Sequence, residues 1–295
     1  MIYSFIFVMV SAISIVFVQK LSLTIPPFFS LLVTSFIALI YFNLVNINKL
    51  KAMYQACWGQ KKLWLITMVT VLAMWVCAMT APGLIGASLY AFLYFAWRGM
   101  VAFSSLSLQD WKKKRVEFCC AMLILLLIIG NLIYAMNISF SQKDLLGIGI
   151  ALMGGTSAFI YFKQSQQLLK MIKLSATQIL AVRFYLTILF SLPILFQPGI
   201  SKNFTINNFT SLTILAFLSM IIPLYFAQKA LEKISAEQHA IISSLCPVAT
   251  AIVQEFTFGD VSIVQGGTYL LYSIIIGSYY LFKNNMKKME VRALI

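Results

Sequence analysis

The feature that most constrains this chain is a series of long apolar segments that recurs over almost its whole length. A transmembrane helix needs about 20 apolar residues, because each residue advances the helix by about 1.5 Å through a hydrocarbon core about 30 Å thick. Ten candidate segments lie near residues 2–18, 26–45, 63–81, 84–108, 118–137, 145–162, 176–196, 211–230, 240–258 and 265–282. The chain is therefore predicted to be an all-α integral membrane protein with ten transmembrane helices.

Composition agrees with this prediction. Of the 295 residues, 61% are hydrophobic and only 10% are charged, whereas soluble domains carry about 25% charged residues. So few charges do not cover the surface of a soluble enzyme, and the apolar content excludes a disordered chain. The first segment lacks a basic leader and a small-residue cleavage site and is followed by Gln19 and Lys20, so we expect a retained helix there. Pro82-Gly83 is expected to end the third segment.

The basic residues are unevenly distributed between the two predicted sides of the membrane. With ten spans, seventeen of the 22 basic residues fall on the side that holds both termini, and three fall on the opposite side. This asymmetry predicts that both termini face the cytoplasm, and we expect a bacterial inner membrane. Since these residues are spread over five short segments, nucleic acid is not an expected partner.

The two halves of the chain are weakly similar to each other. When residues 84–100 are aligned with 233–249, Arg98 aligns with Pro247. Five spans per half make the second half enter the membrane from the opposite side, which predicts an inverted repeat.

This repeat predicts the organisation of the whole chain. Residues 1–137 are expected to form the first five-helix repeat and residues 145–282 the second, followed by a basic cytoplasmic tail over 283–295.

The last two predicted spans carry a recognisable pattern. It comprises a small residue that opens the ninth span, a mid-helix proline, a Gly-Asp pair, a Gln-Gly pair and a late glycine, here Ala236, Pro247, Gly259-Asp260, Gln265-Gly266 and Gly277. In this pattern residues 235–282 resemble the closing helices of the drug/metabolite transporter superfamily, EamA-like type. The resemblance implies a ten-helix carrier of small organic solutes that works by alternating access around a central cavity, and it transfers no substrate.

The first half departs from the family pattern at two positions. The mid-helix proline is replaced by Arg98, and the arginine often found in the second helix of each repeat is present as Arg183 but is Thr34 in the first half.

Arg98 is the most informative residue, because an arginine in mid-membrane costs about 2.5–3.5 kcal/mol or more. Its helical face carries mostly small groups and one phenol, namely Ala87, Ala91, Tyr94, Phe95, Ala102 and Ser105. Arg98 is therefore expected to face the helix bundle and to bind an anionic group of the solute. The alternative is a structural arginine that binds backbone carbonyls or extends to the cytoplasmic surface.

Further candidates have structural alternatives as well. Arg183 is expected to contact the solute, to extend to the surface or to close a cytoplasmic gate. Ser243 and Pro247 are expected either to line the cavity or only to pack against neighbouring helices. Aromatic residues near the midplane, Trp75, Tyr90, Tyr94, Trp97 and Tyr225, suit a cavity that stacks a flat ring. The predicted substrate-binding residues are Arg98, Arg183, Tyr94, Trp75, Tyr225, Ser243 and Pro247.

Several functions lack the residues that they require. The five cysteines lack zinc-finger spacing and the chain has one histidine, His239, expected at the surface where the ninth span begins. No P-loop, nucleophile elbow or paired carboxylates occur, so we expect no catalytic residue, metal or cofactor. The acid inside a predicted span is Glu255, near its outer end, so transport is expected to depend weakly on a pH gradient. Cys57 is expected in a basic loop open to labelling from the cytoplasm.

The leading hypothesis is a carrier for a small anionic or zwitterionic metabolite, such as an amino-acid derivative or a nucleotide-like molecule. The expected partners are this solute and the lipid bilayer, with the chain a monomer or weak homodimer. An exporter of drugs or amphiphiles and a lipid-precursor flippase are the alternatives within transport, although a buried arginine repels cationic drugs. A membrane transferase requires an interior His/Asp/Glu cluster that the spans lack. A non-transporting assembly or sensor protein is the remaining alternative.

Overall fold

A computed structural model describes residues 2–107, 115–138, 141–259 and 261–293, and their regular structure is helical. The α-helices are α1 (Ile2–Ser22), α2 (Pro27–Val45), α3 (Leu50–Gly59), α4 (Lys61–Ile85), α5 (Ala87–Ser107), α6 (Arg115–Ile138), α7 (Gln142–Met171), α8 (Ala176–Ala181), α9 (Tyr185–Ser191), α10 (Ile206–Leu215), α11 (Ile222–Leu231), α12 (Ala236–Ser243), α13 (Cys246–Phe258) and α14 (Ile263–Ala293). Asp260 of the family pattern lies outside the described residues, and so do Lys112, Lys113 and Lys114, three of the seventeen basic residues on the side that holds both termini.

Eight helical stretches among the described residues are long and apolar enough to cross a membrane. They are Ile2–Ser22, Pro27–Val45, Lys61–Ile85, Arg115–Tyr134, Gln142–Met171, Ala176–Phe196, Ile206–Leu231 and Ala236–Phe258. The protein is thus an all-α, multi-pass integral membrane protein, as predicted. The long helices α5 and α14 occupy the fourth and tenth predicted segments, but their arginine, tyrosine, serine and glycine content makes them less apolar than the other eight stretches.

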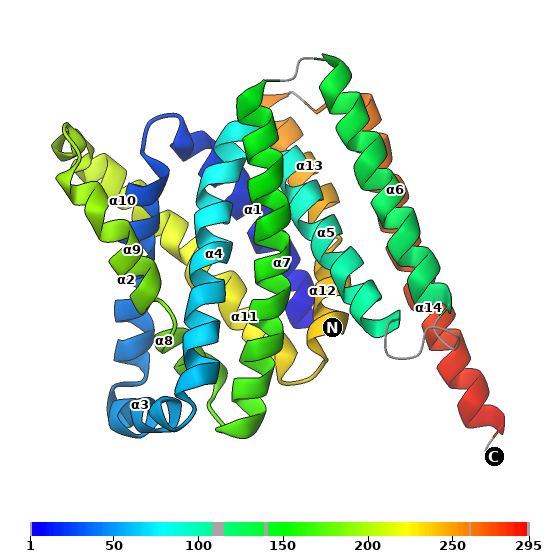
Figure 1. Ribbon diagram of the computed structural model, residues 1–295, viewed down its shortest axis with the longest axis horizontal. Coiled ribbons are helices and arrows are strands. Elements are labelled where there is room, and N and C mark those ends of the chain that lie inside the picture. The colour runs from blue at the N-terminus through cyan, green and yellow to red at the C-terminus, as the bar shows by residue number, and fades with distance from the viewer. Residues whose placement is uncertain (1, 108–114, 139–140, 260, 294–295) are drawn as a thin grey trace.

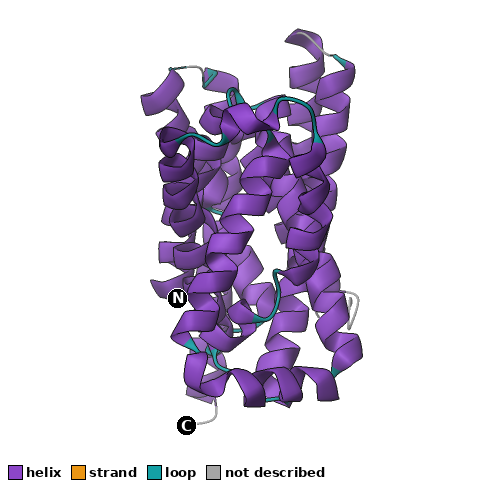
Figure 2. Ribbon diagram, turned by 90° about the vertical axis from the view of Figure 1, so that its left-hand side faces the viewer, coloured by secondary structure: helices purple, strands orange, loops and turns teal. Residues whose placement is uncertain are grey.

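The helices form a central group with an edge group on each side (Figure 1). Helix α1 lies inside the central group, where it contacts α4, α5, α11, α12 and α13. Helices α6 and α14 pack against each other at one edge, and α2, α9 and α10 lie at the other (Figure 1). Figure 2, turned by 90°, shows the described helices joined by loops. The interior around α1 is therefore the place where residues from both halves of the chain meet.

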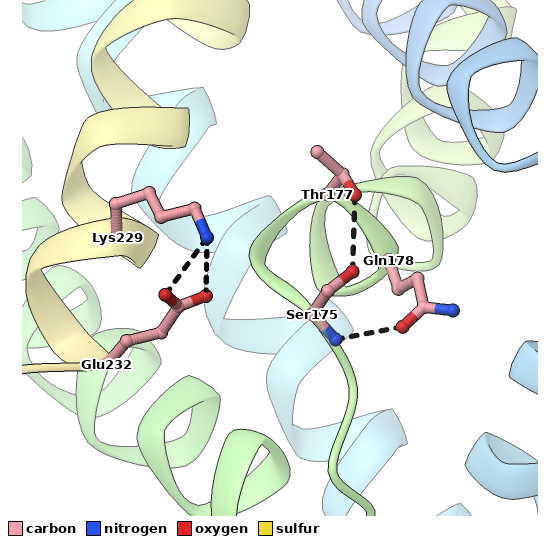
Figure 3. Close-up of polar contacts among 5 residues, drawn as sticks. All are labelled: Ser175, Thr177, Gln178, Lys229 and Glu232. Carbon is pink, nitrogen blue, oxygen red and sulfur yellow. Dashed lines mark hydrogen bonds and ion pairs between the residues drawn. The ribbon is translucent and has the colours of Figure 1, made fainter.

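Local sequence explains where several helices begin. Ser141, Ser175 and Ser235 each precede a helix, and each is followed three residues later by an aspartate or glutamine. In this capping arrangement side chains satisfy amides that lack a partner within the helix. At α8, for example, the Ser175 N–H donates to Gln178 Oε1 at 2.8 Å (Figure 3).

Interruptions occur in three of the long helical stretches of the second half. The stretch from α8 to α9 breaks at residues 182–184, a π-helical segment (Ala216–Ile221) precedes α11, and α12 ends at Ser243 before α13 begins at Cys246. Pro247 lies in the first turn of α13, where its missing N–H has no helical partner to lose. Helices α2, α4 and α5 of the first half are each continuous.

Two local predictions were wrong. Pro82-Gly83 does not end the third span, because α4 continues through Pro82 to Ile85 and ends at Gly86, whose φ of 79° favours glycine. Cys57 does not lie in an open loop. It lies on α3, whose packing leaves its side chain fully buried beside the exposed Trp58.

Small residues on α7 permit close packing in the central group. Gly154 lies so close to α4 that a Cβ atom there would be 2.7 Å from Cys77 Cβ. One face of this helix is buried throughout, and its members are Gly147, Ala151, Gly154, Ala158 and Tyr161. Helix α7 is thereby brought against both α4 and α5.

Candidate functional site

A small cavity of about 60 Å³ lies in the central group, between α1, α4, α5, α7, α11 and the π-helical segment. Its polar lining consists of hydroxyl groups and aromatic side chains from four elements, namely Ser11, Ser14, Trp75, Tyr90, Tyr94 and Ser219. The cavity therefore combines surfaces that stack a ring with groups that form hydrogen bonds.

Helical spacing places these groups together. Ser11 and Ser14 share a face of α1 because they are three residues apart, and Tyr90 and Tyr94 share a face of α5, with ring centroids 5.3 Å apart. Trp75 projects from α4, and its buried Nε1 has no hydrogen-bond partner among the described residues. This indole N–H is thus available as a donor beside the cavity.

Arg98 lies directly behind one wall of the cavity. The wall consists of the rings of Phe7, Phe95 and Phe162, here called the aromatic wall. The Arg98 Cζ atom lies 5.8, 5.0 and 5.1 Å, respectively, from the centroids of these rings. Contact with aromatic faces stabilises a guanidinium but does not neutralise it.

Arg98 is fully buried, as the sequence predicted, and its charge is uncompensated. Its Nε, Nη1 and Nη2 atoms make no hydrogen bond of normal geometry with the described residues, although the Tyr94 hydroxyl lies near enough to interact with the guanidinium. No aspartate or glutamate in that part of the chain is buried. By contrast, Lys229 and Glu232 at the end of α11 are partly exposed and form an ion pair at 3.0 Å (Figure 3). Because a buried charge is costly unless it is paired, the Arg98 guanidinium is a candidate anion-binding group.

Arg183 is also fully buried but belongs to a different polar group. It lies at the interruption between α8 and α9, where its Nη1 donates to the Tyr161 hydroxyl and its Cζ lies 4.6 Å from the centroid of Phe184. Gln228 Nε2 donates to the same Tyr161 hydroxyl at 2.7 Å. Arg183 does not line the cavity. The group joins α7, α11 and the α8–α9 interruption.

Side chains from the first half bind the carbonyl groups at this interruption. Trp64 Nε1 of α4 donates to the Val182 carbonyl at 2.7 Å, and Asn43 Nδ2 of α2 donates to the Ala181 carbonyl at 3.3 Å. The last carbonyls of a helix lack partners within it, so these two donors stabilise the break.

The structure brings some of the other predicted site residues to the cavity and leaves others apart. Trp75 and Tyr94 line the cavity, but Tyr225, Ser243 and Pro247 do not. The Tyr225 ring packs against Phe226 at 5.6 Å, and the Ser243 hydroxyl donates to the His239 carbonyl at 2.7 Å. One face of α12 and α13 is buried in packing against α1 and α5: Ala236, Ala240, Ser243, Ser244, Thr250, Ala251 and Gln254.

Sequence reasoning did not identify several residues of the site. The hydroxyl pair on α1 was detectable from its helical spacing, but the aromatic wall and Ser219 carried no distinguishing signal. The prediction for His239 was wrong. It is fully buried because the first turns of α12 pack inside the bundle, with Nδ1 3.0 Å from the Ser4 hydroxyl. No cluster of three or more potential metal ligands occurs in the described residues.

Comparison with known proteins agrees with this architecture. Residues 145–282 match the EamA-like transporter family. This match agrees with the resemblance to the drug/metabolite transporter superfamily that the sequence pattern indicated.

The fold is also found among solved structures. One of them, titled only as the crystal structure of a protein, matches with a TM-score of 0.66 and 13% sequence identity over 95% of this chain and 98% of that chain. At this identity the match supports the fold alone. No curated protein matches the sequence.

Proposed function

We propose that this protein is a membrane carrier for a small anionic or zwitterionic metabolite, such as an amino-acid derivative or a nucleotide-like molecule. The transporter domain over residues 145–282 supports transport of a small solute. The negative charge of the solute is inferred from Arg98, an unpaired buried cation behind the wall of a polar cavity. The solute's flat or apolar part occupies the cavity, and its anionic group pairs with Arg98.

The proposed architecture is ten spans in two inverted repeats, residues 1–137 and 145–282, with both termini in the cytoplasm. Long helical stretches at all ten predicted positions support it. We propose a monomer or weak homodimer, because the cavity lies within a single chain.

Alternating access provides the mechanism. A cavity of about 60 Å³ holds only a few atoms, so the helices around it must separate to admit a solute. The interrupted stretches of the second half supply places where helices bend, while the continuous α2, α4 and α5 move as rigid rods. The contacts of Arg183 with Tyr161 hold one such interruption against α7 and suit a gate.

The first test uses benzoate and benzamide as a matched anionic and neutral pair, alongside a thermal-shift screen of a metabolite library. Arg98→Ala should weaken benzoate binding about 5- to 150-fold, or about 1–3 kcal/mol, because the charge-assisted hydrogen bonds are lost. Arg98→Lys should recover part of the affinity, since an ammonium lacks the bidentate fork. Calorimetry measures the affinities, and binding of benzamide should not change.

Leu212→Ala, at a buried position that does not line the cavity, controls for general loss of stability. Unchanged benzoate affinity in a stable Arg98→Ala protein would contradict the anion site. A structural arginine would instead lower the melting temperature in both Arg98 variants before binding changed.

A further inference from the structure

A second nitrogen-bearing side chain lies beside Arg98. His239 of α12 is fully buried, and its ring centroid lies 5.1 Å from that of Phe7 and 5.0 Å from that of Phe162. The same two phenylalanines contact the Arg98 guanidinium. Helices α1, α5, α7 and α12 thus bring an imidazole and a guanidinium together behind the aromatic wall.

The hydrogen bonds of His239 leave one ring nitrogen free. Ser4 Oγ of α1 lies 3.0 Å from Nδ1, and Nε2 has no partner among the described residues. If the Ser4 hydroxyl donates to Nδ1, the ring proton of the neutral imidazole resides on Nε2. His239 Nε2–H and the nitrogens of Arg98 are then a group of buried donors whose side chains contact the same two phenylalanine rings and which make no hydrogen bond of normal geometry with the described residues. Buried polar groups are nearly always paired in native proteins, so this group points to a ligand.

We propose that His239 is the second residue of the anion site and that its Nε2–H donates to one oxygen of an oxyanion whose other oxygen pairs with Arg98. The ligand group is a carboxylate or a phosphate, because either presents two or more acceptor oxygens. This inference rests on the proposed function and adds a specificity-determining residue to it. A primary amide or a halide leaves part of the donor group unpaired, which disfavours its binding.

The site lies on the far side of the aromatic wall from the cavity. Phe7 and Phe162 line the cavity and also contact both Arg98 and His239. The rings must therefore turn aside for the oxyanion to reach the donors. A neutral imidazole suffices as a donor, so the arrangement requires no proton transfer with the solute and is compatible with weak dependence on a pH gradient.

Because His239 is the only histidine, isotope-labelled histidine gives a single imidazole spin system in protein purified with a tag that lacks histidine. Added benzoate should shift the Nε2–H signal until the site is saturated, and the dissociation constant from this titration should equal the one measured by calorimetry. Benzamide should not shift the signal. The nitrogen shifts also report the tautomer. Benzoate that binds without moving the signal, or a complex with an imidazolium, would overturn the proposal. The affinities of benzoate and phenyl phosphate, measured side by side, then show whether the site prefers a carboxylate or a phosphate.

Substitution provides a second test that does not depend on spectroscopy. His239→Leu should weaken benzoate binding about tenfold or more, the loss expected for a hydrogen bond to a charged group. His239→Gln places an amide nitrogen near the Nε2 position and should restore affinity to within about threefold of the native protein. Leu212→Ala again controls for stability. Should His239→Leu fail to fold, the glutamine variant and the histidine signal still decide the question.

The outcomes separate this inference from the proposed function. If Arg98→Ala binds benzoate weakly while His239→Leu binds it with native affinity, His239 is not part of the site. The proposed anion carrier is then retained. Unchanged affinity in both variants would remove both proposals. A fall in melting temperature without loss of affinity in His239→Leu would assign His239 to packing.

Discussion

Cys57 provides a test at the scale of a single residue. Its side chain on α3 is fully buried, and this burial raises the pKa of the thiol to about 11. Only the thiolate attacks a maleimide, so well below pH 11 the reaction should be slow, and it should accelerate as pH rises. We expect N-ethylmaleimide at pH 7 to spare Cys57 in the folded protein and to modify it after denaturation, as measured by peptide mass spectrometry.

The neighbouring position supplies the control for Cys57. Trp58 is 69% exposed, so a Trp58→Cys thiol should react rapidly under the same conditions. Equal rates at positions 57 and 58 in the folded protein would contradict the burial of Cys57.

The interruption between α8 and α9 is the corresponding test at the scale of an element. Trp64→Phe removes the indole donor to the Val182 carbonyl but keeps an aromatic ring. The buried carbonyl then loses a partner, so the free energy of unfolding should fall by about 1–3 kcal/mol and the melting temperature with it. Thermal melts in detergent measure the effect, and Trp58→Phe, at an exposed position of α3, serves as the matched control. Equal melting temperatures for both variants and the native protein would show that the interruption does not depend on Trp64.

The orientation of the whole molecule follows from its charge distribution. Helix α3 and the C-terminal end of α14 lie toward the same end of the bundle (Figure 1), and the positive-inside rule places this end in the cytoplasm. A membrane-impermeant maleimide should therefore label Trp58→Cys, or a cysteine introduced after residue 290, only in permeabilised cells. Ile206→Cys, at the exposed start of α10, should be labelled in intact cells. The opposite pattern would reverse the proposed topology.

Much of the fold was predictable from the sequence, because a membrane span is a local property. Length and hydropathy alone located the long helices, and a run of apolar residues has the same meaning wherever it occurs in the chain. Helical periodicity likewise predicted that Arg98 faces inward, since its face of α5 carries small side chains. The family pattern in the second half was equally local, because its residues lie within one contiguous stretch.

The candidate site was determined by tertiary contacts. His239 meets Ser4 across 235 residues of sequence, and Arg98 of α5 faces Phe7 of α1 and Phe162 of α7. The burial of Cys57 and His239 depends on which helices pack beside them. The residues next to Cys57 and His239 in the sequence do not indicate which helices these are. The sequence by itself therefore determined that the chain crosses the membrane and that it buries an arginine. Only the packing of distant helices decided that this arginine lacks a partner and lies with an imidazole behind a cavity wall, because the pairing of buried polar groups depends on contacts between segments far apart in the chain.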